Sequence, residues 1–233
     1  MCRFKSGIIL KNRCYVPDID RHSDMLDELK IEDTYENEVR KFIRAELVPV
    51  DNEWWTDPAD WKFVVDQDVT PEWFLEDRER YEKEFRGVVS AWWNEHVLVD
   101  KKIDELSNGS YILKRCEVKR LLNDVKIMVF DSSQVGKMLD SSQVGEMWGS
   151  SQVGEMLDSS QVGEMWGSSQ VGEMFGSSQV GKMFGSSQVG KMWDSSQVGE
   201  MWGDSIARNY STGKILISSE SRLEIVVFEN KEV

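Results

Sequence analysis

The first residue with reactive chemistry is Cys2. If Met1 were removed, the chain would begin at a thiol whose neighbouring amine could act as a base. Arg3 and Phe4 follow, and no downstream motif completes a catalytic set. We therefore expect a buried thiol at the start of a strand, with Cys2-dependent hydrolysis or group transfer as the enzymatic alternative.

A second candidate is the segment 18–24, with the sequence DIDRHSD. It places the four ligand-type residues Asp18, Asp20, His22 and Asp24 at every second position, so that in an extended chain they would point to one side and could bind a divalent metal. The same composition is typical of a solvated turn that leads to a helix capped by Ser23. We expect the turn, and we expect no metal site and no cofactor.

Tryptophans form the third group. The pairs Trp54-Trp55 and Trp92-Trp93, together with Trp61 and Trp73, could form a platform on which sugars or bases stack. The alternative is that they form the core of a small domain and its seam with the rest of the chain. We expect the core.

These residues must be positioned within a chain that is dominated by a repeat. Residues 131–202 read eight times D/G-S-S-Q-V-G-E/K-M-φ, where φ is Leu, Trp or Phe, without insertion or deletion. Helix is disfavoured, because every unit contains a central Gly, two serines and a β-branched Val. A short strand with a bend at Gly fits better, and so short a unit buries a core only by stacking on its copies.

The ninth position indicates how many units make one coil. Over the first four units Leu alternates with Trp, so the period is 18 residues. We therefore predict a parallel β-solenoid with two strands per coil, with Val and Met inside and the ninth position on the opposite face. An antiparallel meander and a disordered repeat are the alternatives, and disorder is disfavoured because Val and Met never vary.

The ninth-position residues are the predicted binding surface, because contiguous exposed aromatic side chains usually mark an interface. We name those of odd-numbered units the odd ladder and those of even-numbered units the even ladder. The odd ladder is Leu139, Leu157, Phe175 and Trp193, and the even ladder is Trp148, Trp166, Phe184 and Trp202. The alternative is that these side chains turn inward at the coil corner and widen the core.

Four parts follow from these patterns: an α+β head domain (1–110), an N-terminal solenoid cap (111–130), the β-solenoid (131–202) and C-terminal cap strands (203–233). In the head, the sequence predicts a hairpin over 3–16, a helix over 24–29, strands over 42–50 and 61–65, and a helix over 71–94 that is capped by Thr70. Closing strands are expected over 214–217 and 223–228.

Charge and cysteine usage narrow the class of protein. The formal net charge is −14, and neither the head nor the repeats are basic, so direct nucleic-acid binding is not expected. Three widely spaced cysteines without a CxxC pair argue against disulfides and structural zinc. The N-terminal segment lacks signal-peptide features, and no stretch suits a membrane span. We expect a cytoplasmic protein that does not contact membranes.

The opening MCRFKSGIIL, the segment KFVVDQDVTPEWF and the tandem SSQVG units together resemble a poorly characterised group of phage and gut-bacterial proteins. The resemblance covers most of the chain. It implies a short α+β head, a repeat tail and an intracellular, phage-encoded context, and it transfers no functional residues.

The sequence therefore favours a non-enzymatic binding or assembly protein. The solenoid would act as a rigid rod that forms a homodimer through the ninth-position residues, and the acidic head would contact a protein partner. An acidic mimic of DNA that inhibits a host factor is an alternative within the same class.

Overall fold

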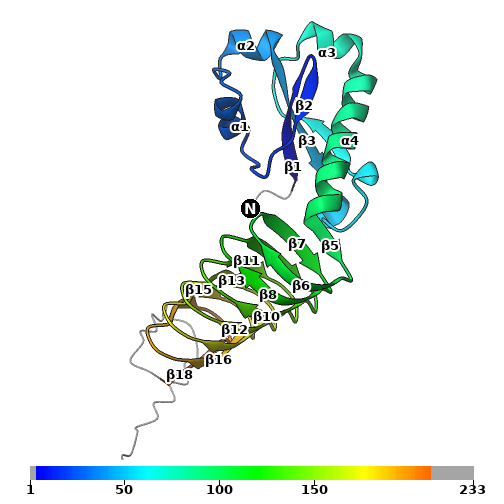
Figure 1. The fold of residues 1–233 in the computed structure, drawn as a ribbon. Coiled ribbons are helices and arrows are strands. Elements are labelled where there is room, and N and C mark those ends of the chain that lie inside the picture. The colour runs from blue at the N-terminus through cyan, green and yellow to red at the C-terminus, as the bar shows by residue number, and fades with distance from the viewer. Residues whose placement is uncertain (1–3, 211–233) are drawn as a thin grey trace, which may run out of the picture. The chain divides into compact units, whose positions relative to one another are not determined.

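The computed structural model describes residues 4–210, which form two units that meet between Val97 and Leu98. The first unit contains helices and one sheet, and the second is a stack of strands (Figure 1). The predicted fold class, an α+β region followed by a parallel β-solenoid, is confirmed.

The first unit is built on a four-stranded antiparallel sheet in the order β2-β1-β3-β4. Its strands are β1 (Lys5–Leu10), β2 (Arg13–Tyr15), β3 (Phe42–Val48) and β4 (Lys62–Val65). Its helices are α1 (His22–Glu28), α2 (Tyr35–Arg40), α3 (Glu72–Glu76) and α4 (Arg78–His96), with short 3-10 turns η1 (Val50–Asn52) and η2 (Pro58–Asp60).

The two faces of this sheet are covered by different helices. On one face, Ile8 and Phe42 pack with Met25 and Leu26 of α1. Residues of the opposite parity point to the other face, where Phe63 contacts Phe85 of α4 at 5.9 Å between ring centroids. Figure 1 shows α1 and α4 on opposite sides of the strands.

Helix boundaries in the first unit differ from the sequence prediction. The first helix begins at His22, and Ser23 makes no capping bond. The single helix expected over 71–94 is two helices, because the backbone at Asp77 (φ −144°, ψ 43°) interrupts it, and Thr70 does not cap the first. Helix α2 was not predicted; its Thr34 side chain accepts a hydrogen bond from the Asn37 N–H.

The second unit has two seven-stranded sheets, in which consecutive strands alternate between the sheets. The strands that precede the repeats are β5 (Val97–Val99), β6 (Lys102–Ser107), β7 (Ser110–Lys114), β8 (Glu117–Leu122) and β9 (Lys126–Phe130). The repeats supply β10 (Gln134–Met138), β11 (Gln143–Met147), β12 (Gln152–Met156), β13 (Gln161–Met165), β14 (Gln170–Met174), β15 (Gln179–Met183), β16 (Gln188–Met192) and β17 (Gln197–Met201), and β18 (Ile206–Asn209) follows.

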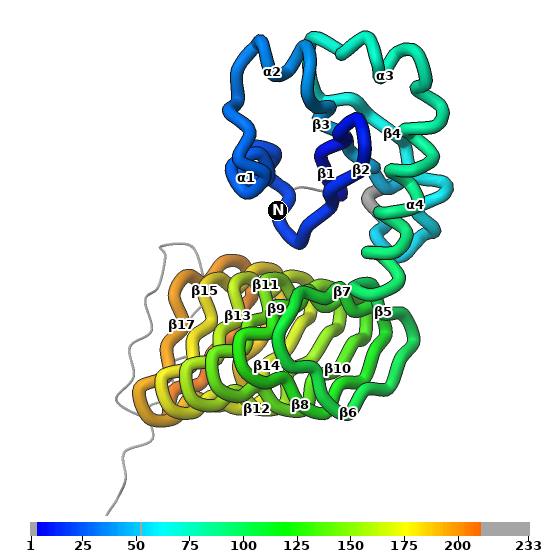
Figure 2. Tube along the Cα trace, turned by 45° about the horizontal axis from the view of Figure 1, so that its top comes forward, coloured from blue at the N-terminus to red at the C-terminus, as the bar shows by residue number. Residues whose placement is uncertain are grey.

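The register confirms the 18-residue coil. In the parallel pair β10–β12, Val135 lies beside Val153 and Met138 beside Met156. Every later pair within the repeats keeps this offset, so the Gln, Val and Met side chains lie over their copies in the next coil. The turned view shows the coils stacked along one direction (Figure 2).

The solenoid core consists of the Val and Met ladders, as predicted, and each of these side chains is buried. Val and Met of one strand are three residues apart, and a regular strand would point them to opposite faces. Both point inward because the alternation is broken at the glycine between them, for example Gly136 between Val135 and Met138.

The turns between strands depend on the first position of the unit. Asp131, Asp140, Asp158 and Asp194 have φ between 55° and 59°, and the glycines at this position have similar positive values. Asp and Gly accept this left-handed conformation more readily than other residues, which explains why no third residue type occurs there. The second serine of each unit is fully buried beside the turn.

The strands of the solenoid begin earlier than the sequence indicates. We placed the end of the head at residue 110, whereas β5 and β6, which precede that residue, already belong to the two solenoid sheets. Their coils are shorter: Lys102 lies beside Glu117, 15 residues later, and Ser110 beside Lys126, 16 residues later. These strands lack the 18-residue period and the Ser and Gly positions of the repeat, so the sequence did not indicate that they belong to the solenoid.

At the other end, β18 continues one sheet beyond the last repeat through its pairing with β16. The closing strands predicted over 214–217 and 223–228 lie outside the described residues. Within residues 4–210, no helix is both long and apolar enough to cross a membrane.

Candidate functional site

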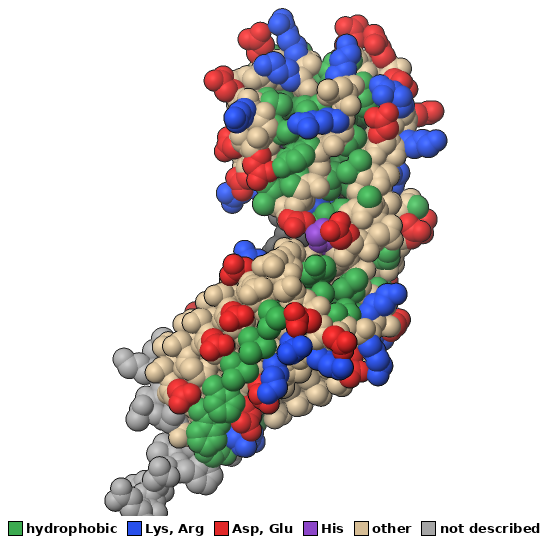
Figure 3. All heavy atoms as spheres, in the orientation of Figure 1, with side chains coloured by type: hydrophobic (Ala, Val, Ile, Leu, Met, Phe, Trp, Pro, Cys, Tyr) green, Lys and Arg blue, Asp and Glu red, His purple; other side chains and the backbone are tan. Residues whose placement is uncertain are grey.

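The ninth-position residues form two continuous ladders at the outer surface of the solenoid. All eight side chains are partly exposed, and none belongs to the Val/Met core. The alternative in which they turn inward therefore does not hold. Figure 3 shows a stripe of hydrophobic side chains that runs along the solenoid, with charged side chains on both sides.

Stacking makes each ladder a rigid surface. In the even ladder, the rings of Trp148 and Trp166 are 5.1 Å apart and nearly parallel, and Trp166 and Phe184 are 4.0 Å apart. In the odd ladder, Phe175 stacks on Trp193 at 6.5 Å, and Trp193 continues onto Tyr210 at 5.1 Å. The offset of one coil brings each ring over the one in the next coil, so the rings of each ladder lie in contact along the stack.

The seventh position of each unit lies beside the ladder and differs between the two sheets. The indole N–H groups of Trp148, Trp166 and Trp202 donate to the glutamate two residues earlier, at 2.7, 3.1 and 3.4 Å. Trp193 follows Lys191 instead, and its buried N–H has no acceptor among the described residues.

The charges beside the odd ladder pair with one another between coils. Lys137 binds Glu155 at 2.8 Å, and Lys191 binds Glu173 at 2.9 Å. This row of two lysines and two glutamates is therefore neutral. The row beside the even ladder holds Glu146, Glu164, Lys182 and Glu200, a net charge of −2, with one ion pair between Lys182 and Glu164 at 3.7 Å.

The predicted candidates in the first unit do not form a single site. Cys2 lies outside the described residues. Burial raises the pKa of the Cys14 thiol to about 11 and also raises that of Cys116, so neither thiol is poised as a thiolate nucleophile.

The segment 18–24 does not gather its ligand-type side chains at one point. Asp18 accepts a hydrogen bond from the Trp92 indole at 3.0 Å, and Asp20 pairs with Lys5 at 2.9 Å. His22 faces Asp66 instead, at 3.3 Å. The alternating residues Asp18, Asp20 and His22 therefore contact three different partners.

The tryptophan pairs serve mainly as core. Trp54 and Trp61 are buried and meet edge to face at 5.5 Å, and Trp92 packs against Trp54 at 6.4 Å. The Trp93 indole donates to the Trp54 carbonyl at 2.6 Å. These contacts leave no flat face shared by the two pairs, so the stacking platform is not formed.

A polar cluster that the sequence did not predict lies on the α1 face of the head sheet. It comprises His22 at the start of α1, Glu46 in β3 and Asp66 just after β4. One ligand-type atom of each lies within 4.8 Å of the others. The three residues are 20 to 44 positions apart, so the sequence named His22 as a possible ligand but no local spacing could indicate Glu46 and Asp66 as its neighbours.

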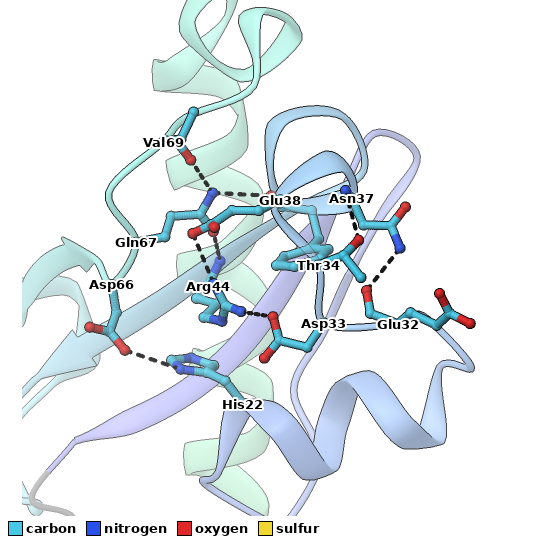
Figure 4. Close-up of polar contacts among 11 residues, drawn as sticks. His22, Glu32, Asp33, Thr34, Asn37, Glu38, Arg44, Asp66, Gln67 and Val69 are labelled. Carbon is cyan, nitrogen blue, oxygen red and sulfur yellow. Dashed lines mark hydrogen bonds and ion pairs between the residues drawn. The ribbon is translucent and has the colours of Figure 1, made fainter.

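Neighbouring contacts fix the position of Asp66. Its backbone N–H donates to the Arg44 carbonyl at 2.9 Å, and Gln67 accepts from the Arg44 N–H at 2.7 Å. The Gln67 amide donates in turn to the Val69 carbonyl. Figure 4 shows this arrangement, with the ring of His22 directed at the Asp66 carboxylate.

Comparisons with protein-family models, with curated proteins and with solved structures find no match. Functional inference therefore rests on the geometry of the solenoid surface and of the polar cluster.

Proposed function

We propose that the chain is a non-enzymatic assembly protein whose solenoid forms a homodimer through the odd ladder. The observation that carries this proposal is the unbroken, partly exposed hydrophobic ladder, in which Phe175 and Trp193 stack on each other. Such a surface loses little side-chain freedom when it is covered, which lowers the entropic cost of association.

The sizes of the odd-ladder residues suit a two-fold axis. They increase along the solenoid from Leu139 and Leu157 to Phe175 and Trp193. A two-fold axis that pairs two copies in opposite directions would set Leu139 against Trp193 of the second copy and Leu157 against Phe175. Each small side chain would then face a large one. Because neighbouring strands are about 4.8 Å apart in both copies, the two ladders would stay in register along their length.

Charge also favours the odd ladder over the even one. Its flanking row is neutral and internally paired, so covering it would bring little repulsion. The row beside the even ladder carries a net −2, and its glutamates hold three of the indoles. Two copies joined through that surface would bring like charges together.

We further propose a cytoplasmic, phage-encoded setting. The free thiols of Cys14 and Cys116 support a reducing compartment, and the resemblance of the sequence to phage and gut-bacterial proteins supports the context. The acidic head would then be available for a protein partner.

Light scattering coupled to gel filtration tests the dimer. We expect the wild type to have twice the mass of one chain and Leu157→Ser/Phe175→Ser to have the mass of one chain. The matched control is Trp166→Ser/Phe184→Ser, which changes the even ladder in the same part of the solenoid and should remain a dimer. A monomeric wild type would overturn the proposal, and so would dissociation of the control variant alone.

A further inference from the structure

We propose that His22, Glu46 and Asp66 bind one divalent transition-metal ion, of which zinc is the best example. The inference is independent of the proposed dimer, because it concerns only the head unit. It rests on the geometry of one histidine and two carboxylates, which together carry the charge and donor set that such an ion takes.

The orientation of the His22 ring is the first argument. Its Nε2 lies 3.3 Å from the Ala45 carbonyl oxygen, which can only accept, so Nε2 carries a proton and donates it. In the neutral ring, Nδ1 then has a lone pair. A backbone carbonyl that orients a histidine through its other nitrogen is the usual arrangement behind a metal ligand.

The group opposite Nδ1 is the second argument. The Asp66 Oδ2 atom lies 3.3 Å from Nδ1, so an acceptor faces a lone pair unless a cation lies between them. That cation is either a proton on His22 or a metal. Two ligands of a tetrahedral zinc ion are about 3.4 Å apart, which matches the observed separation.

Glu46 is the third argument. Its side chain is only 9% exposed, and no described residue donates a hydrogen bond or forms an ion pair with it. A carboxylate that is shielded from most of the solvent and receives no hydrogen bond is costly to keep ionised. A shared metal would supply the missing positive charge for both Glu46 and Asp66.

A buried hydroxyl without a partner among the described residues lies opposite Glu46. Ser6 is opposite Glu46 in the β1–β3 register, on the same face of the sheet, and its Oγ has no hydrogen-bond partner among the described residues. Directly opposite residues in antiparallel strands are neighbours, so this hydroxyl is placed to support a ligated Glu46.

The donor set selects the class of metal. One imidazole and two carboxylates suit zinc, manganese and iron, whereas calcium and magnesium prefer oxygen ligands alone. Asp66 is 59% exposed, so one side of the ion would be open to solvent. Three protein ligands with an open position are typical of sites where the metal binds water or a substrate group.

Isothermal titration of the full-length, metal-stripped protein with Zn²⁺ tests the site. We expect one ion per chain, and weakening by more than about 100-fold in His22→Gln and in Glu46→Gln, since loss of a ligand should exceed the effect of losing an outer partner. Asp66→Asn changes a largely exposed side chain and should fold normally, so it gives the same test if the buried variants do not.

The matched control is His96→Gln. His96 is the other histidine of the chain, and it lies outside the cluster, with its Nε2 atom 3.4 Å from the carboxylate of Asp18. This variant should bind zinc as the wild type does. X-ray absorption of the zinc-loaded wild type should show nitrogen and oxygen neighbours and no sulfur, which separates this site from binding to cysteine.

Absence of zinc binding by the wild type would overturn the proposal and leave a protonated His22–Asp66 ion pair as the account of the cluster. Equal zinc binding by wild type and Asp66→Asn, or sulfur among the neighbours, would also overturn it. Titration with Ca²⁺ should give at least tenfold weaker binding than zinc, and stronger binding of Ca²⁺ would contradict the assigned role of His22.

Discussion

Gly163 lies against the carbonyl oxygen of Gly145 in the preceding coil, so closely that a Cβ atom at Gly163 would be 2.5 Å from that oxygen. At six further central glycines, an added Cβ atom would likewise lie 2.4 to 2.6 Å from a backbone carbonyl oxygen of the preceding coil. Real Cβ atoms do not approach a carbonyl oxygen this closely. The central glycine is therefore needed for the approach of one coil to the next.

This relationship predicts the effect of Gly163→Ala. The added methyl group cannot be accommodated without moving backbone on both coils, so we expect the free energy of unfolding to fall by about 1–3 kcal/mol. Chemical denaturation measures it. Ser159→Ala, at an exposed turn position of the same unit, should change stability by less than about 0.5 kcal/mol. Equal stability of Gly163→Ala and wild type would contradict the close approach.

A second prediction concerns Lys5, whose side chain is 1% exposed. Its Nζ donates to the Pro17 carbonyl at 2.6 Å, pairs with Asp20 at 2.9 Å and lies 4.4 Å from the centre of the Trp92 ring. Because Asp20→Asn would leave a buried cation without its counter-ion, we expect a loss of about 3 kcal/mol in unfolding free energy.

The matching measurement is a double-mutant cycle with Lys5→Met. The double variant should lose less unfolding free energy than the two single variants lose in sum, because it removes both charges together. Glu84→Gln breaks the exposed pair with Arg80 and should cost less than about 1 kcal/mol. A coupling energy near zero between Lys5 and Asp20 would contradict the buried pair.

A third prediction follows from Glu46 in metal-free protein. Its pKa in the folded state is raised to about 7 from an ordinary value of 4.5, so the folded protein holds this proton more tightly than the unfolded chain does. Glu46 therefore makes the free energy of unfolding fall as the pH rises from about 4.5 to 7, and the loss remains above pH 7.

Glu46→Gln removes this titration. Relative to wild type, the variant should gain about 2–3 kcal/mol in unfolding free energy between pH 5 and pH 8, measured with urea in the presence of a chelator. His22 gives the opposite slope, since its folded pKa is lowered, and Asp66 and Asp20 also face this region. The comparison with wild type therefore isolates Glu46. Glu76→Gln, at an exposed position, should follow the wild type, and parallel curves for Glu46→Gln and wild type would contradict the raised pKa.

Much of the solenoid could be predicted because the residue pattern that specifies it is short and recurs in every unit. Val and Met recur at fixed places in every unit, and the Leu–Trp alternation at the ninth position gives the 18-residue coil directly. Stacked copies can satisfy such a pattern in few ways, so fold class, inward residues and register all followed. Strands β8 and β9 lie in the predicted N-terminal cap, whereas β5 and β6 escaped prediction because the coil lengths and residue types there depart from the repeat.

The sequence by itself determined the composition of each ladder and the period with which the ladders stack. Only the tertiary structure decided which backbone atoms meet, and so why Gly lies between Val and Met and why Asp and Gly share the turn. It alone brought His22, Glu46 and Asp66 together from α1, β3 and the end of β4. A repeat encodes its own contacts because neighbours in the stack are copies of one another, whereas the head cluster depends on how three unrelated segments pack on one sheet.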